Sequence, residues 1–141
     1  MTTIAYDHKN KTISCDGRST NGEGMIISDS EIKYVKQSGW IFFQTGAYCD
    51  REILIGHFLN LGESRHSENE MIAIKDGNAY ICGHCNKDGF WKEYLNSNAA
   101  IGSGRVWAIA GMDFGLSSKD AVKYASKRDC YTGGKVRTFK V

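Results

Sequence analysis

A threonine at the start of the chain could act as a catalyst. The sequence begins Met1-Thr2-Thr3, and a small second residue lets a cellular aminopeptidase remove the initiator methionine. Thr2 would then carry a free α-amine beside its own hydroxyl. Because an α-amine titrates at about 7.7–8.0, it can take the proton that makes the hydroxyl a nucleophile. Thr2 is therefore a candidate nucleophile whose base lies in the same residue.

A second candidate for chemistry is the segment Cys82-Gly83-His84-Cys85. Two cysteines at this spacing can form a redox dithiol or half of a zinc site. A thioredoxin-like dithiol needs its second cysteine at the start of a helix and a nearby cis-proline. Here Asn86-Lys87-Asp88-Gly89 predicts a turn, and the chain has no proline. A zinc site would need two further ligands, and no second pair has the spacing. We expect thiols at the end of a strand and no metal or other cofactor, with a redox or metal protein as the weaker alternative.

The composition predicts one ordinary globular domain that spans residues 1–141. Hydrophobic residues make up 41% of the chain and charged residues 24%, and the net charge is +2. This balance gives no reason to expect a nucleic-acid partner. The longest apolar run, Val106–Ala110, is too short to cross a bilayer, and no secretion signal is visible. The five cysteines are odd in number and form no disulfide framework, so we expect a cytoplasmic protein.

Hydrophobic patterning predicts antiparallel strands and three helices. The expected strands are Thr3–Asp7, Lys11–Cys15, Gly24–Ser28, Ile32–Lys36, Trp40–Gln44, Met71–Lys75, Asn78–Cys82, Phe90–Tyr94, Ala99–Ile101 and Val136–Val141. The expected helices are Tyr48–Leu61, Gly104–Gly115 and a third that begins after Ser117 and runs to about Arg128. Antiparallel strands with helices on their faces indicate a layered α+β sandwich.

Several short motifs occur in a fixed order along nearly the whole chain. They are Thr2-Thr3, Cys15-Asp16-Gly17-Arg18, Lys33, Thr45-Gly46, Gly102-Ser103-Gly104 and Arg128-Asp129-Cys130-Tyr131-Thr132-Gly133-Gly134. None is specific alone, but their joint order, anchored at the first residues, resembles the N-terminal-threonine peptidases. These are the proteasome β subunits and the HslV-type peptidase. The resemblance implies a four-layer αββα sandwich of antiparallel sheets and an Ntn-hydrolase that needs no cofactor.

The resemblance also implies catalytic roles for residues at matching positions. Thr2 would be the nucleophile, and Lys33 would lower the pKa of its hydroxyl because a nearby cation favours the ionised form. Asp16 would pair with Lys33 and keep it charged. The backbone N–H of Gly46 would stabilise the oxyanion. Ser103, Asp129 and Thr132 would position the α-amine; the family usually has serine where this chain has Thr132.

Substrate contacts are implied in the same way. The side chains of a specificity pocket would come from Ser19, Glu31, Gln44, Tyr48 and Glu52. Two carboxylates among them would favour a basic side chain before the cut. Thr20 and Ala47 would offer backbone hydrogen bonds to an extended substrate.

The sequence departs from the family after the first helix. The family has a second long helix there, but Glu63–Glu70 is too polar and too short for one. That helix lies in a region used for assembly, so a homo-oligomeric ring and an ATP-dependent unfoldase partner do not follow automatically. Two further alternatives stay open. One is a catalytically silent relative that serves as a ring component or decoy binding protein. The other is an amidase for small molecules rather than for peptide or protein substrates.

Overall fold

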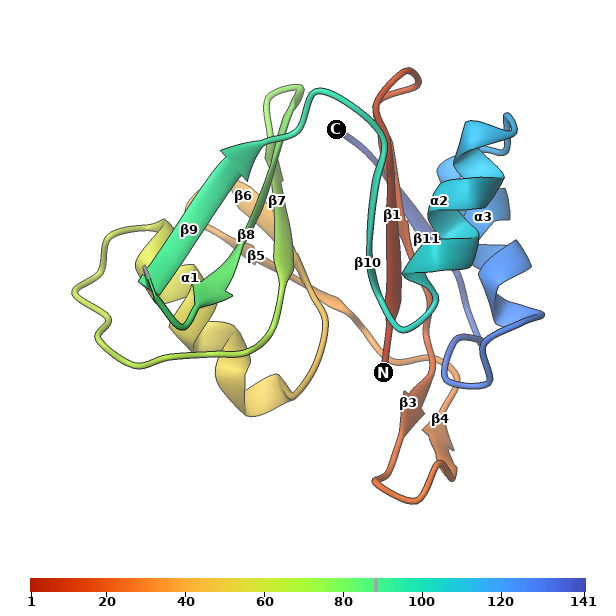
Figure 1. Cartoon of the computed structure of the whole chain (residues 1–141), viewed down its shortest axis with the longest axis horizontal. Coiled ribbons are helices and arrows are strands. Elements are labelled where there is room, and N and C mark those ends of the chain that lie inside the picture. Colours follow the sequence, from red (N-terminus) through yellow and green to blue (C-terminus); the bar gives the residue numbers. More distant parts are fainter. Residues whose placement is uncertain (88) are drawn as a thin grey trace.

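The computed structural model describes residues 1–87 and 89–141. Two antiparallel sheets face each other, and helices cover the outer side of each sheet (Figure 1). The predicted αββα order of layers is therefore confirmed. One residue of the predicted turn Asn86–Gly89, Asp88, lies outside the described residues.

The first sheet has the strand order β10 (Ala99–Gly102), β1 (Thr3–Asp7), β2 (Thr12–Cys15) and β11 (Arg137–Lys140). Helices α2 (Arg105–Asp113) and α3 (Ser118–Ser126) pack on its outer face. Apart from Met112, the buried side chains of this layer are small, namely Ala5, Ala108, Ala121, Val122 and Ala125. Because these side chains are small, the helices lie close to the strand that follows Thr2.

The second sheet has the strand order β5 (Tyr34–Gln37), β6 (Trp40–Gln44), β7 (Met71–Lys75), β8 (Asn78–Cys85) and β9 (Gly89–Tyr94). A short 3-10 helix, η1 (Tyr48–Asp50), leads into helix α1 (Arg51–Phe58), which covers this sheet. Phe42, Leu54, Phe58 and Met71 form the contact between helix and sheet. Each of these side chains is buried, as the apolar spacing of the helix predicts.

Large apolar side chains fill the space between the two sheets. Ile4, Tyr6 and Ile13 from the first sheet meet Phe43 and Ile72 from the second, and all five are fully buried. Every residue of β1 is buried, because one face of this strand meets the second sheet and the other meets the helices. The strand that begins beside Thr2 is therefore held on both faces.

Most sequence-based boundaries agree with the structure to within a few residues. The helix cap at Ser117 is confirmed, since its Oγ accepts a hydrogen bond of 3.1 Å from the Asp120 N–H. The missing second helix is also confirmed, because residues 61–70 contain no helix. Two predictions were incomplete: strand β8 continues to Cys85, and the two-residue strand β3 (Ser19–Thr20), which pairs with β4 (Ile26–Ser28), was not foreseen.

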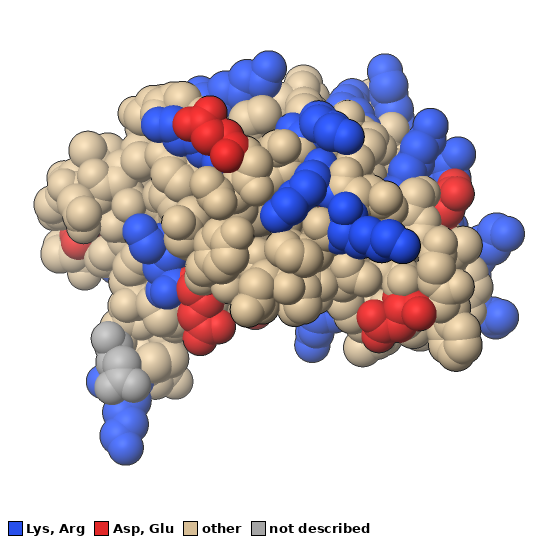
Figure 2. Space-filling model, turned by 90° about the horizontal axis from the view of Figure 1, so that it is seen from above, with Lys and Arg blue, Asp and Glu red and all other residues tan. Residues whose placement is uncertain are grey.

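Charged side chains lie mainly on the surface. On the face shown in Figure 2, Lys and Arg are spread out with uncharged surface between most of them. Lys33 is the exception among the described lysines, because its side chain is only 8% exposed and the others are partly or fully exposed. No helix in the described part of the chain is long and apolar enough to cross a membrane.

Candidate active site

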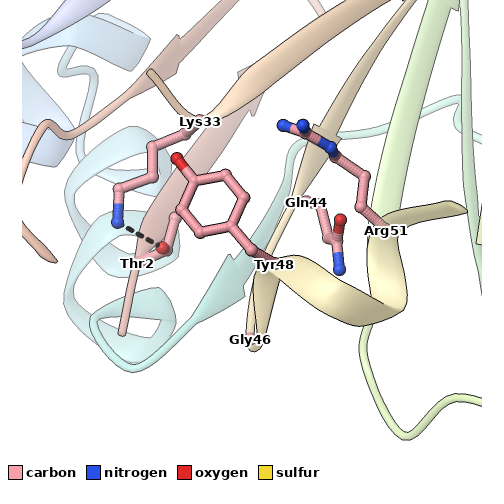
Figure 3. A pocket seen from close by; sticks show the side chains of 6 residues that line it. All are labelled: Thr2, Lys33, Gln44, Gly46, Tyr48 and Arg51. Carbon is pink, nitrogen blue, oxygen red and sulfur yellow. Dashed lines mark hydrogen bonds between the residues drawn. The ribbon is translucent and has the colours of Figure 1, made fainter. Parts of the chain in front are cut away.

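Thr2 lies at the start of β1 with its side chain pointing toward Lys33 (Figure 3). The Nζ atom of Lys33 donates a hydrogen bond of 2.9 Å to Thr2 Oγ1. Thr2 is 3% exposed, so this pair is shielded from bulk water. A cation at this distance stabilises the alkoxide form of the hydroxyl more than it would in water.

The ammonium group of Lys33 has three hydrogen-bond acceptors. Besides Thr2 Oγ1, it donates to the carbonyl oxygens of Met1 at 3.2 Å and Arg18 at 2.6 Å. Burial lowers the pKa of Lys33 below its usual 10.5, and the charges of Asp16 and Glu31 oppose that shift. An ammonium has only three protons, so all of them are committed to these oxygens.

Asp16 stabilises the backbone around this pair. Its carboxylate accepts hydrogen bonds from the N–H groups of Thr3 at 3.0 Å, Gly133 at 3.1 Å and Arg18 at 3.3 Å. Burial raises the pKa of Asp16, while these N–H donors and the charge of Lys33 lower it. The expected ion pair with Lys33 is wrong: within the described residues, no Asp16 oxygen lies within 4.0 Å of Nζ. The carboxylate is directed at backbone donors, and it influences Lys33 only through its charge.

A network of hydrogen-bonded side chains connects residues in the C-terminal third of the chain to the segment that begins at Thr2. Asp129 Oδ2 accepts hydrogen bonds of 2.6 Å from both Ser103 Oγ and Thr132 Oγ1. Thr132 Oγ1 also lies 2.6 Å from Thr3 Oγ1, and the Ser103 N–H donates to the Thr2 carbonyl at 2.9 Å. The structure thus brings together the three residues that the resemblance assigned to the α-amine. Thr3, which the sequence analysis included in a motif without assigning it a role, completes this network.

Two glycines with positive φ lie at the site, one packed against Thr2 and the other against Asn69. Gly102 has a φ of +97°, and a Cβ atom there would overlap the Thr2 carbonyl oxygen. Gly46 has a φ of +85°, and a Cβ atom there would overlap the side-chain oxygen of Asn69. Only glycine adopts such angles without strain. Gly46 lines both pockets that open beside Thr2, the position expected of an oxyanion donor.

One of these pockets is narrow, with an accessible volume of about 20 Å³. It is lined by Thr2, Lys33, Gln44, Gly46, Tyr48 and Arg51 (Figure 3). The other pocket has a volume of about 330 Å³ and includes Asn69, His84, Trp91, Ser103 and Arg105. We call the first the head-group pocket and the second the broad pocket.

The lining of the head-group pocket corrects the expected specificity residues. Gln44 and Tyr48 line it as predicted, but the expected Glu52 does not: it is exposed on α1. Glu31 lies behind the pocket wall, where its carboxylate is hydrogen-bonded to the Tyr48 hydroxyl and lies 3.5 Å from Ser19 Oγ. Arg51 occupies the wall instead. The 3-10 helix η1 determines which face of α1 lines the pocket. The rotation of α1 about its axis could not be read from the residue pattern alone.

The backbone positions expected to hold an extended substrate are partly available. Strand β3, with Thr20, pairs with β4 on one side only, so its other edge is open for strand addition. The Ala47 carbonyl already accepts hydrogen bonds from Gln44, Asn69 and Asp50. Ala47 can therefore offer a substrate its N–H group but not its carbonyl.

The cysteine pair does not form a dithiol site. Both Cys82 and Cys85 lie on strand β8, and residues three apart on a strand point to opposite faces. Cys82 is fully buried, and burial raises its pKa to about 12. The described residues contain no group of three or more metal-ligating side chains that could hold an ion.

Comparison with solved structures identifies the fold. No family model and no curated protein sequence matches the chain. The protein BPH of Thiobacillus denitrificans, solved in complex with epoxomicin, superposes with a TM-score of 0.75 at 16% identity, covering 98% of this chain and 97% of that one. HslV from Trypanosoma brucei superposes with a TM-score of 0.71 at 20% identity, covering 99% of this chain and all of that one. The chain has the fold of the HslV-type peptidases.

This fold assignment confirms the resemblance that the sequence motifs indicated. A second structure of Thiobacillus denitrificans BPH gives a TM-score of 0.73 at 15% identity. Identities this low establish the HslV-type fold and leave the chemistry to be argued from the site itself.

Proposed function

We propose that this protein, which has the HslV-type fold, is a threonine peptidase that hydrolyses amide bonds through an acyl-ester on Thr2. The observation that carries the proposal is the buried hydrogen bond between Lys33 Nζ and Thr2 Oγ1. A lysine is seldom buried unless its charge is used, and here the nearest side-chain acceptor is a threonine hydroxyl next to an open pocket.

The reaction needs the α-amine of Thr2, so Met1 must first be removed. The free amine then takes the proton of the Thr2 hydroxyl, and Oγ1 attacks the scissile carbonyl carbon. The negative charge that develops on the carbonyl oxygen is stabilised by the Gly46 N–H. When the C–N bond breaks, the amine returns the proton to the leaving nitrogen. A water molecule, deprotonated by the same amine, hydrolyses the ester and frees Thr2.

The surrounding residues keep these groups in place. Lys33 holds the Thr2 oxygen and favours its ionised form, while the charge of Asp16 opposes the loss of the Lys33 proton. Ser103, Asp129 and Thr132 form a hydrogen-bonded cluster that would position the amine. No step requires a metal or an organic cofactor.

The proposal extends to the whole protein. Residues 1–141 form a single catalytic domain that acts on peptides or unfolded protein in the cytoplasm, as a homo-oligomer. Supply of substrate by an ATP-dependent unfoldase is part of the family's way of working, and the loop at residues 61–70 would have to replace the missing helix in any such contact.

Hydrolysis of short fluorogenic peptides by three forms of the protein tests this function. The wild-type chain without Met1 should hydrolyse them, and Thr2→Ala should have no measurable activity. Thr2→Ser keeps a hydroxyl and an amine, so it should retain part of the rate. Equal rates for Thr2→Ala and wild type would contradict the proposal.

A further inference from the structure

We propose that the head-group pocket selects a carboxamide, so that the residue before the cut is glutamine or asparagine. The inference rests on the proposed function, because it concerns the substrate of that site. It replaces the basic side chain that the sequence predicted, since the two carboxylates assumed there do not line the pocket.

Gln44 supplies a hydrogen-bond acceptor. The residue is 7% exposed, and its Nε2 donates a hydrogen bond of 3.1 Å to the Ala47 carbonyl. That bond fixes the orientation of the amide, because the reverse orientation would place Oε1 against a carbonyl oxygen. Gln44 Oε1 is buried and has no hydrogen-bond partner among the described residues. A buried acceptor without a donor is costly, so a ligand that donates to it gains affinity.

Arg51 supplies hydrogen-bond donors. Its guanidinium lies 5.1 Å from the centre of the Tyr48 ring, on the wall of the same pocket (Figure 3). In the described part of the chain it forms neither an ion pair nor a hydrogen bond. Lys33 is directed at Thr2 Oγ1 and the Arg18 carbonyl, two acceptors that remain after Met1 is removed, so Arg51 is the pocket-lining cation without a hydrogen-bond partner in the described part of the chain.

A carboxamide matches both groups at once. Its oxygen accepts from Arg51, and its NH2 donates to Gln44 Oε1. A carboxylate would also bind Arg51 but would place a second acceptor against Gln44 Oε1. A lysine or arginine side chain would meet the positive charge of Arg51. None of the residues that line the pocket is a carboxylate, and Glu31 is hydrogen-bonded to Tyr48. The pocket is narrow, which favours a small head group over an aromatic ring.

Matched tripeptide substrates that differ only in the residue before the cut test the inference. We expect kcat/KM for the glutamine peptide to exceed that for the glutamate peptide about tenfold, the effect of one satisfied acceptor, and to exceed that for the arginine peptide by more. Gln44→Leu should abolish the preference for glutamine over glutamate. Arg51→Met should lower kcat/KM for both the glutamine and the glutamate peptide relative to kcat/KM for a matched leucine peptide. Glu52→Gln, outside the pocket, should change none of these ratios.

Binding of the same peptides to Thr2→Ala, followed by fluorescence polarisation, separates the inference from the proposed function. Tighter binding of the glutamine peptide supports the inference even if the wild-type protein hydrolyses no peptide, an outcome that would overturn only the function. Hydrolysis with a preference for arginine or glutamate, or without any preference, would overturn the inference and leave the function standing. Equal binding of all peptides without hydrolysis would overturn both.

Discussion

The side chain of Lys33 has the central role among single residues in the proposed mechanism. It is buried, it has no carboxylate within ion-pair distance in the described part of the chain, and it donates to the hydroxyl of Thr2. Such a lysine costs stability, because burial opposes its charge. The cost is explained if the charge serves the nucleophile.

Replacing Lys33 should therefore have a larger effect on kcat/KM than on the stability of the folded protein. We expect Lys33→Met to lower kcat/KM at least about a hundredfold, the range for loss of a group that assists proton transfer. The matched control is Lys36→Met on strand β5, where the side chain is exposed. Peptide hydrolysis and thermal unfolding of both variants provide the comparison. Loss of activity in Lys36→Met, or unchanged activity in Lys33→Met, would contradict the assigned role.

The pH dependence follows from the lowered pKa of Lys33. Activity should fall on the alkaline side at a pH below 10.5, as the ammonium loses its proton. In the interval between the folded-state pKa and 10.5, the folded protein binds fewer protons than the unfolded chain, so this group makes stability rise with pH. Asp16→Asn removes a charge that raises the pKa of Lys33, and should move the alkaline limb to lower pH. A kcat/KM profile that is identical in wild type and Asp16→Asn would contradict this coupling.

How far the sequence predicted the site depends on the kind of residue. Thr2, Lys33, Gly46 and Ser103 lie within two residues of the end of a strand, whose position the fold fixes. Asp129 and Thr132 lie in the loop between α3 and β11, where their hydrogen bonds to each other and to Ser103 and Thr3 place them. Arg51 was missed, and Thr3 was assigned no role. Their roles depend on how α1 is rotated and on which hydroxyl faces which, and neither leaves a signal in residue spacing.

At the level of elements, the turn from β10 into α2 sets the distance between Ser103 and Thr2. Gly102 makes this turn with a φ of +97° and leaves room for the Thr2 carbonyl, to which the Ser103 N–H is bonded. Any side chain at residue 102 would push the first residues of β1 away from the polar cluster.

Gly102→Ala should therefore lower both stability and activity. Backbone strain alone costs about 1–3 kcal/mol, and the overlap with Thr2 adds to it. Gly77→Ala is the matched control, because Gly77 has a φ of +81° but nothing within 4 Å of the added Cβ. Urea unfolding should show a loss in both variants, larger in Gly102→Ala, and only Gly102→Ala should lose activity. Equal stability and activity of the two variants would show that the close approach is unimportant.

The elements also show where sequence patterns fail. Alternation and helical spacing predicted the long strands and helices, because each buries one regular face. The two-residue strand β3 has no period to detect, and strand β8 continues through Gly83 because its partner β9 supplies the hydrogen bonds. The C-x-x-C segment lies inside strand β8, and that position became clear only from the pairing with β9.

Among the exposed apolar side chains of the described residues, two sets are the most prominent. Met25, Ile26 and Ile27 on the β3–β4 hairpin are 61%, 48% and 60% exposed, and Phe114 at the end of α2 is 92% exposed. In Figure 1 the hairpin projects away from both sheets. Exposed apolar groups of this kind favour association.

We therefore expect a homo-oligomer that depends on the hairpin. Light scattering after gel filtration should give a mass that is a multiple of 15.7 kDa, and Ile27→Ser should lower it. Thr20, which lies in strand β3 of this hairpin, is a proposed substrate contact, so dissociation should also weaken peptide hydrolysis. A wild-type mass of a single chain would contradict this prediction without affecting the chemistry at Thr2.

The most direct test of the central claim is the intact mass of the protein after incubation with a peptide epoxyketone. This reagent requires both the hydroxyl and the free amine of an N-terminal threonine. We expect a chain that has lost Met1 and carries one adduct, with no adduct on Thr2→Ala. A chain that has lost Met1, remains folded and gains no adduct would contradict the assignment of Thr2 as the nucleophile.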